Sequence, residues 1–372
     1  MLKFDHAVIM AAGRGMRMMP LTNVIPKAMA PFNGSTIIAD GIKNIKDHID
    51  NLYITVGYKG ATLSEHVINK GVSAVFNTTG KGNAWWVYNT LIKNINSILD
   101  LINEYEIFFF DQWGVVHDGE KIFPDAEKVF EALQKNKKKI FIISNSGKRS
   151  SDNINRMKKL GANHILKSPI ITSGDVCYEL LLNKREPFQN IGNNYFVVAT
   201  DYPLLDKTNY KKTLDLEKSD FLLLTSTAGF NDYENLKQIF DQAIQLNLPL
   251  VCSNPDILGV SGEKVHPSTG DLAIQYKKLG GTIHIIGKPG FEIFEFVFNQ
   301  SSSLKEKVLM VGDSLFNDIF GANQFEIDSL LITSGIHRKD FSSNRDFQEI
   351  IDNIHSAYQN TGSPTYIMEK LK

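Results

Sequence analysis

Four apolar runs of the chain are followed by polar side chains that suit the handling of a phosphoryl group. They are Asp111 after "IFFF", Ser144 and Asn145 around the end of "KIFIIS", Lys288 after "IHIIG", and Asp313, Ser314 and Asp318 in "MVGDSLFND". A carboxylate can attack phosphorus to give an aspartyl phosphate, while an ammonium group neutralises charge on the phosphoryl oxygens. A further pair of acids offers the oxygen ligands that Mg²⁺ prefers. The pattern predicts Mg²⁺-dependent phosphoryl chemistry.

These side chains can meet only if the runs before them form neighbouring strands. Short apolar runs alternate with helical patterns along the chain, which is typical of parallel sheets in α/β domains. We expect strands at residues 7–11, 52–56, 73–76, 107–110, 139–144, 195–200, 221–226, 249–253, 283–287, 308–313 and 329–333. Open α/β sheets bind ligands beyond the carboxyl ends of their strands. A single Asp or Ser there is ordinary turn chemistry, but the repetition at four strand ends indicates a site.

The chain, at 372 residues, is longer than one hydrophobic core usually allows, so two or three domains are expected. Periodicity near 3.6 predicts helices at 125–135, 233–246 and 291–299. The segment 89–106 is interpreted as a helix that leads into a new sheet. We therefore place a domain boundary near residue 103.

Composition narrows the classes of function. A net charge of −1 gives no basic excess for nucleic acid, and the run "KNKKK" at 135–139 is most simply a solvated helix end. The apolar run at the start is too short for a signal peptide or a membrane span. Cys177 and Cys252 stand apart without metal-ligand spacing, which fits a reducing compartment. We expect a cytoplasmic protein with no nucleic-acid or membrane partner.

Residues 104–345 resemble the haloacid dehalogenase (HAD) superfamily of hydrolases. The resemblance rests on "DQWGV", "SNSG", "GKP" and "GDSLFND", and "NPD" at 254–256 is similar to subclass IIA, the p-nitrophenylphosphatase-like group. It implies an α/β fold in which a Rossmann-like HAD core, 104–171 and 285–372, holds an inserted α/β cap of the C2 type, 172–284. It also implies these roles: nucleophile Asp111, phosphoryl-binding Ser144 and Lys288, Mg²⁺ ligands Asp111, Asp313 and the Trp113 carbonyl, and supporting residues Asp318 and Asn145.

Trp113 departs from the family pattern, which has an aspartate there that protonates the leaving group and then activates water. Indole N–H is only a hydrogen-bond donor, and losing positioned acid/base catalysis typically costs ~10²- to 10⁴-fold in rate. The enzyme is then a slow phosphatase for good leaving groups, or His117 or Asp118 supplies the proton, or the domain binds a phosphorylated ligand without turnover. Cleavage of C–X or C–P bonds also stays open, because other branches of the superfamily lack this carboxylate.

The first hundred residues carry a second pattern, "GRGMRMMPLTNVIPK". Gly13 and Gly15 let backbone N–H groups approach a phosphate, and Arg17 and Lys27 can neutralise a nucleoside triphosphate. The full pattern resembles the start of sugar-phosphate and choline-phosphate nucleotidyltransferases. The likeness stops near residue 95, before the metal-binding aspartate and most of the acceptor pocket. We therefore expect residues 1–103 to form a truncated half domain without transferase activity.

Two classes of function follow. The first is a Mg²⁺-dependent phosphatase acting on a sugar, polyol or amino-alcohol phosphate. The alternative is a catalytically weak protein that binds a nucleotide or a partner, or a bifunctional nucleotidyltransferase/phosphatase of surface glycan precursor synthesis. A truncated transferase sheet would leave an open edge, which the hydrolase part or a second chain of a homodimer would have to cover.

Overall fold

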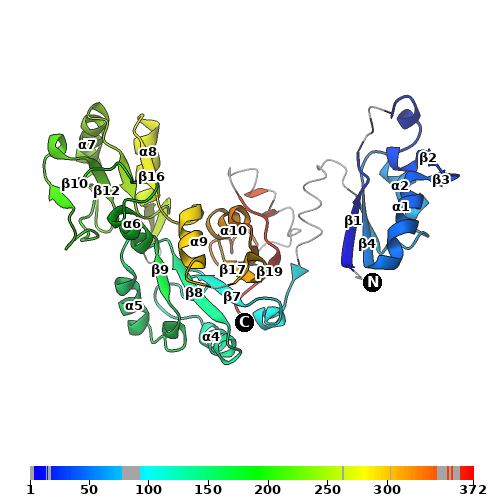
Figure 1. Ribbon diagram of the computed structural model, residues 1–372, viewed down its shortest axis with the longest axis horizontal. Helices are drawn as coiled ribbons and strands as arrows, with labels where there is room; N and C mark the ends of the chain where they lie inside the picture. The colour runs from blue at the N-terminus through cyan, green and yellow to red at the C-terminus, as the bar shows by residue number, and fades with distance from the viewer. Residues whose placement is uncertain are drawn as a thin grey trace. The chain divides into compact units, whose positions relative to one another are not determined.

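The chain folds into two compact units, Met1–Ile92 and Lys93–Lys372. The structure is a computed structural model that describes residues 4–13, 15, 18–77, 93–261, 264–301, 303–341, 350–351, 353–354 and 361–372. Figure 1 shows the elements of both units. No helix in these ranges is long and apolar enough to cross a membrane.

The first unit is a three-stranded parallel sheet of order β1-β4-β5 with a short hairpin and two helices. Its elements are β1 Phe4–Met10, β2 Pro31–Phe32, β3 Ser35–Thr36, α1 Ile37–Ile45, β4 Ile49–Val56, α2 Gly60–Val67 and β5 Ala74–Asn77. Thr36 caps α1 by accepting a hydrogen bond from the Ala39 N–H at 3.3 Å. The buried face of β4 packs on both helices, so this unit has a small apolar core of its own.

The second unit is built on a seven-stranded parallel sheet of order β6-β19-β18-β17-β7-β8-β9. Its strands are β6 Lys93–Asn94, β7 Ile107–Asp111, β8 Lys139–Ser144, β9 Ile170–Thr172, β17 Val308–Gly312, β18 Asp328–Ile332 and β19 Tyr366–Met368. Its helices are α4 Ala126–Lys135, α5 Ser150–Lys159, α6 Ser173–Leu182, α9 Phe291–Phe298 and α10 Phe320–Phe325. Helices α4 and α5 cover one face of the sheet, and α9 and α10 cover the other (Figure 1).

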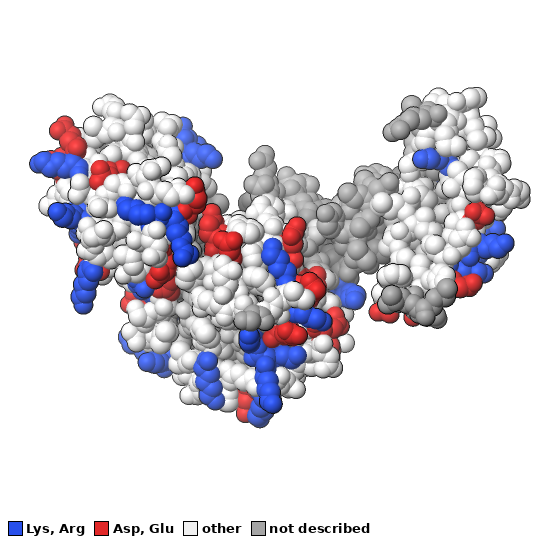
Figure 2. Space-filling model, in the orientation of Figure 1, with Lys and Arg blue, Asp and Glu red and all other residues white. Residues whose placement is uncertain are grey.

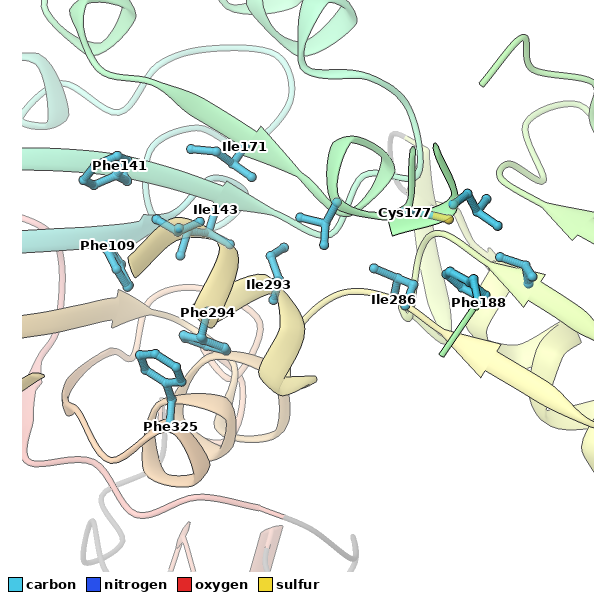
Figure 3. Packing of buried hydrophobic residues seen from close by; sticks show 14 of the residues in the cluster. Phe109, Phe141, Ile143, Ile171, Cys177, Phe188, Ile286, Ile293, Phe294 and Phe325 are labelled. Atoms are coloured by element: carbon cyan, nitrogen blue, oxygen red, sulfur yellow. The ribbon is translucent and has the colours of Figure 1, made fainter. Parts of the chain in front are cut away.

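Strand β7 is buried on both faces, which explains why its sequence is uninterrupted apolar rather than alternating. Phe108 and Phe110 face the cluster that includes α4, where the Phe110 and Phe130 rings lie 4.7 Å apart. Phe109 faces the opposite cluster with Phe294 of α9 (Figure 3). Burial therefore fixes the register of β7 and the position of its last residue, Asp111.

A second parallel sheet, of order β11-β10-β12-β13-β16, is inserted between β9 and β17. It comprises β10 Asn194–Val197, β11 Lys211–Thr213, β12 Phe221–Leu224, β13 Leu250–Cys252 and β16 Ile283–Ile285, with α7 Tyr233–Gln245, α8 Thr269–Lys278 and the hairpin β14 Leu258–Ser261 and β15 Lys264–Pro267. One apolar cluster runs from Phe141 and Ile143 of the core sheet to Phe188 and Ile286 beside the inserted sheet (Figure 3). We call residues 172–284, which carry most of this insertion, the cap.

Every strand and helix expected from periodicity has a counterpart, except the helix at 89–106. Within the described residues 93–106 the chain instead forms β6 and a 3₁₀ turn, Ile98–Leu101. β6 pairs with β19, and Ile98 and Leu101 are buried in the core of the second unit. The units therefore divide at Ile92, about ten residues before the position expected from sequence.

Shortening the chain tests where the second unit begins. We expect residues 93–372 to fold alone, whereas residues 104–372 lose a paired strand and the buried Ile98 and Leu101. Each such side chain contributes about 1.5–3 kcal/mol, so the free energy of unfolding should fall by about 3–6 kcal/mol. Urea unfolding of the two fragments measures this difference. Equal urea midpoints for the two fragments would show that residues 93–103 add nothing to the stability of the unit.

Candidate active site

Asp111 and Lys288 meet at the carboxyl ends of the core strands. Asp111 ends β7, and Lys288 follows β16 through Gly287, whose φ of +134° suits glycine. The Lys288 side chain is buried; its Nζ contacts Asp111 Oδ1, lies 2.7 Å from Asp318 Oδ1, and donates to the Ile143 carbonyl at 3.1 Å. A buried ammonium group is thus held between the expected nucleophile and a second carboxylate.

The charges in this site are unbalanced. Burial raises the pKa of Asp111 to about 7, although the Lys288 ammonium opposes this shift. Burial also raises the pKa of Asp313 well above its ordinary value, and the charges of Asp111 and Asp318 raise it further. Burial lowers the pKa of Lys288, but the two adjacent carboxylates outweigh it and the net shift is upward. Three carboxylates share one ammonium, so a divalent cation would relieve their repulsion.

The carboxylates are arranged as a cation site requires. Asp111, Asp313 and Asp318 each offer an oxygen within 4.8 Å of the others. Asp318 Oδ2 accepts the N–H groups of Asp313 at 3.1 Å and Ser314 at 3.0 Å, while its Oδ1 pairs with Lys288. Asp318 is therefore occupied in holding its neighbours. Asp111 and Asp313 are therefore the two carboxylates that could hold a metal ion. Among the contacts of the described residues, Asp313 uses only Oδ2, which accepts the Ile336 N–H at 2.7 Å.

Glycines allow backbone to pack closely around these acids. A Cβ on Gly114 would lie 1.9 Å from Asp313 Oδ2, and one on Gly335 would lie 2.0 Å from the same atom. A Cβ on Gly312 would lie 2.2 Å from Asp318 Cβ. The backbone that follows Trp113 therefore passes directly beside Asp313. This close approach fits a metal ligand supplied by the main chain at residue 113, as well as by the carboxylates.

Ser144 ends β8, and Asn145 follows it beside Lys288. Ser144 is buried, and its Oγ accepts the Ser146 N–H at 3.3 Å. Asn145 Oδ1 accepts the Lys288 N–H at 2.8 Å, and its Nδ2 donates to the Lys288 carbonyl at 3.3 Å. The structure thus brings together the predicted Asp111, Ser144, Asn145, Lys288, Asp313 and Asp318 from strands far apart in sequence.

The Trp113 side chain packs outside this cluster of acids. Its ring lies 4.9 Å from that of His117, and the Arg156 guanidinium lies 4.8 Å from its centroid. His117 is fully buried, its Nδ1 accepts the Gly119 N–H at 2.9 Å, and burial together with the Arg156 charge lowers its pKa to about 4. Asp118 is exposed and accepts the N–H groups of residues 120 and 121. Asp118 is thus bound within its own turn, and His117 uses Nδ1 as an acceptor, while no partner for its Nε2 is found among the described residues.

The glycine-rich loop of the first unit is described only in part. A Cβ on Gly15, which has φ +66°, would lie 2.8 Å from Lys27 Cβ, so these two residues are neighbours. Among the described residues, no atom lies within 4 Å of the corresponding position on Gly13. Arg17 and most of the segment 77–90 lie outside the described residues. The nucleotide-binding roles of these residues stay predictions.

Two residues that join the site were not assigned a role from sequence. Asp256, between β13 and β14, accepts Nδ2 of Asn145 at 2.8 Å and Nδ2 of Asn317 at 3.4 Å. Asn317 lies in a π-helical turn, Leu315–Ile319, of a kind often found at functional sites. Asp256 follows a strand of the second sheet, so the strand-end argument that found Asp111 could also have found it.

A shallow cavity of about 640 Å³ lies elsewhere, at the amino ends of β8 and β9. It is lined by Glu131, Gln134, Lys135, Lys138, Lys139, Ile140, Phe141, His164, Lys167, Ser168 and Pro169. These residues lie opposite the strand ends that carry the acids, so the cavity is separate from the candidate active site.

Figure 2 shows basic and acidic side chains interspersed on the displayed face of this unit.

Family models match three parts of the chain. Residues 108–206 match a haloacid dehalogenase-like hydrolase, residues 285–357 match a HAD-hydrolase-like family, and residues 6–111 match a nucleotidyl transferase. The transferase match ends on Asp111. In the structure the strand before Asp111 pairs with β8 and β17 of the hydrolase sheet.

Curated relatives match the same two parts. The bifunctional protein GlmU of Methanococcus aeolicus is 31% identical over 115 residues, which are 31% of this chain and 28% of that protein. The chain thus spans less than a third of this relative's length. Chronophin of Rattus norvegicus is 23% identical over 249 residues, 64% of this chain and 80% of that protein.

Solved structures support the same fold. A possible sugar phosphatase of the HAD superfamily from Cytophaga hutchinsonii superposes with a TM-score of 0.62 and 24% identity, over 75% of this chain and 98% of that one. The chain therefore carries haloacid dehalogenase-like hydrolase domain segments at residues 108–206 and 285–357 of its Lys93–Lys372 unit, together with a nucleotidyl transferase-like region at residues 6–111.

Proposed function

We propose that the chain is a Mg²⁺-dependent phosphohydrolase that acts on a small phosphate ester through an aspartyl phosphate on Asp111. The observation that carries this proposal is the contact of Asp111 with the buried Lys288 ammonium, beside the acids Asp313 and Asp318. This set combines a nucleophile, a fixed cation and a metal site at one sheet edge. Asp111, Asp313 and the Trp113 carbonyl would hold Mg²⁺, which supplies positive charge to the phosphoryl oxygens.

Each residue has a defined part in the reaction. One oxygen of Asp111 attacks phosphorus, the bond from phosphorus to the ester oxygen breaks, and its electron pair leaves with that oxygen. Lys288 and the Ser144 hydroxyl bind the phosphoryl oxygens, and Lys288 neutralises charge as it develops. The oxygen of a water molecule then attacks the phosphorus and the bond from phosphorus to the Asp111 oxygen breaks, so inorganic phosphate leaves with the hydrogens of the water and the Asp111 carboxylate is regenerated. Asp318 and Asn145 hold Lys288 and the metal-binding backbone in position.

The surroundings of Trp113 favour esters whose leaving group needs little protonation. His117 is neutral and packed under the indole, and Asp118 is bound to its own turn. A phenolate or a similarly weak base departs without a proton, whereas an alkoxide does not. We therefore propose that aryl phosphates are cleaved faster than the sugar, polyol or amino-alcohol phosphates that the family resemblance indicates.

The first unit is proposed to lack transferase activity. The strand and aspartate that would follow in a transferase are β7 and Asp111, which are part of the hydrolase sheet and pair with Lys288. For the second unit we propose a HAD core, 104–171 and 285–372, extended by residues 93–103, with residues 172–284 as its cap. The buried free thiols Cys177 and Cys252 support a reducing, cytoplasmic setting.

Phosphate release tests the proposed function. With Mg²⁺, we expect hydrolysis of p-nitrophenyl phosphate and slower hydrolysis of a panel of sugar, polyol and amino-alcohol phosphates. EDTA should reduce the rate to background, because the site's carboxylates then repel the anionic substrate, and added Mg²⁺ should restore it. Binding of phosphate esters with no release under any of these conditions would contradict the proposal and favour the catalytically weak alternative.

A further inference from the structure

Asp256 lies in the turn that leaves the cap sheet after β13, and the surrounding backbone fixes its position. Its N–H donates to Asn254 Oδ1 at 2.9 Å, and its carbonyl accepts the Gly270 N–H at 2.9 Å. A Cβ on Gly270 would lie 2.1 Å from the Pro255 carbonyl oxygen, so only glycine lets α8 approach this closely. The Asp256 carboxylate is therefore presented to the core by a rigid turn.

This carboxylate lies at the centre of a hydrogen-bond network that spans the site. Asp256 Oδ1 accepts Nδ2 of Asn145 at 2.8 Å and Nδ2 of Asn317 at 3.4 Å. Asn145 Oδ1 in turn accepts the Lys288 N–H at 2.8 Å. One cap residue is thus linked to the end of β8, to the π-helical turn and to the backbone of Lys288.

The type of side chain at position 256 decides how Asn145 is oriented. Asp256 Oδ1 accepts hydrogen bonds, so it selects the amide nitrogen of Asn145 and leaves the amide oxygen facing the Lys288 N–H. A reversed Asn145 amide would place its NH₂ group against the Lys288 N–H, and two donors would then oppose each other. The acceptor at residue 256 and the Lys288 backbone therefore select the same orientation of Asn145.

We propose that Asp256 is a positioning residue, which acts through Asn145 to hold Lys288 where its ammonium meets Asp111. This inference rests on the proposed function for its kinetic test. Without the acceptor, the Asn145 amide loses its bond to the cap and is held only by its bonds to the Lys288 backbone and to Ser173, so Asn145 and Lys288 are less tightly positioned. A displacement of about 1 Å at such a group can reduce the rate by about 10²-fold.

The test compares Asp256→Ala with Asp256→Asn. Asp256→Ala should lower kcat on p-nitrophenyl phosphate by about 10- to 100-fold with a smaller change in KM. Asp256→Asn keeps an oxygen that can accept a hydrogen bond from Asn145, so its kcat should stay within about threefold of the wild-type value. Asp241→Ala, an exposed carboxylate of the cap helix α7, is the control and should change nothing. A loss of more than tenfold in the kcat of Asp256→Asn would overturn the proposal, and this test holds even if Asp256→Ala does not fold.

A double-mutant cycle separates positioning from general structural damage. Asn145→Ala and Asp256→Ala interrupt the same link, so the double variant should be no slower than the slower single variant. If the losses in kcat of the two single variants instead multiply in the double variant, the proposal is overturned. If the wild type releases no phosphate, the proposed function fails, and calorimetric binding of inorganic phosphate with Mg²⁺ becomes the readout. Asp256→Ala should then bind about tenfold more weakly, and equal binding would contradict the role of Asp256.

Discussion

Asp111→Asn is expected to abolish phosphate release, with a loss of about 10⁴-fold or more in kcat. An amide does not attack phosphorus, and no other described carboxylate replaces Asp111, because Asp318 is bound to Lys288 and two N–H groups. The variant should still fold, since Lys288 keeps Asp318 and the Ile143 carbonyl as partners. Steady-state phosphate release and urea unfolding measure both expectations.

A matched control identifies the chemical role of Asp111. Asp118→Asn makes the same change seven residues later, at an exposed carboxylate bound only within its own turn among the described contacts, and should keep nearly full activity. The phosphoryl group should also be trapped on wild-type protein by rapid acid quenching and be missing from Asp111→Asn. Residual turnover of Asp111→Asn above 1% of wild type would mean that another group is the nucleophile.

Trp113→Asp is expected to change which esters are cleaved. A carboxyl group at this position would protonate the leaving oxygen, and positioned acid catalysis contributes ~10²- to 10⁴-fold. The gain should be large for an alkyl phosphate and small for p-nitrophenyl phosphate, whose phenolate needs little protonation. The measurement is the ratio of kcat/KM for the two substrates in wild type and in the folded variant.

The control for this change is Trp113→Asn, which removes the same ring without adding an acid. Both variants lose the edge contact with the His117 ring and the cation–π contact with Arg156, and replacing a well-packed aromatic can cost up to ~3–5 kcal/mol. Unfolding must therefore be measured for both. If the ratio of kcat/KM for the alkyl phosphate to kcat/KM for p-nitrophenyl phosphate rises in Trp113→Asp but not in Trp113→Asn, the missing acid explains the substrate preference of the wild type. A wild type that already cleaves alkyl phosphates at ordinary phosphatase rates contradicts it, because another residue then supplies the proton.

Local patterns determined much of the second unit. Uninterrupted apolar runs predicted the buried strands β7, β8 and β17, because a strand covered by helices on both faces needs apolar side chains throughout. Polar residues at the ends of those strands predicted which side chains would meet, since parallel strands place their carboxyl ends at one edge. Asp111 and Asp318 accordingly lie at this edge, whereas the expectation for Lys288 was wrong in one respect: it follows β16 of the second sheet, not a strand of the core sheet, and still contacts both acids.

Short elements could not be predicted in the same way. Strands β6, β9 and β19 have two or three residues, too few to show a period. The apolar spacing of 89–106 favoured a helix, but pairing of β6 with β19 and burial of Ile98 and Leu101 decided otherwise. Long-range pairing outweighs local propensity here, because it satisfies backbone groups that the local pattern does not report.

Residue types and their spacing were enough to predict the α/β fold class, the polar side chains at the strand ends and the departure at Trp113. The partners of these residues became known from the folded chain: Lys288 lies between Asp111 and Asp318, the Trp113 ring packs on His117 and Arg156, and Asp256 of the cap reaches Asn145. The physical reason is that side-chain type follows from local sequence, whereas distance, burial and the resulting pKa shifts depend on segments far apart in the chain.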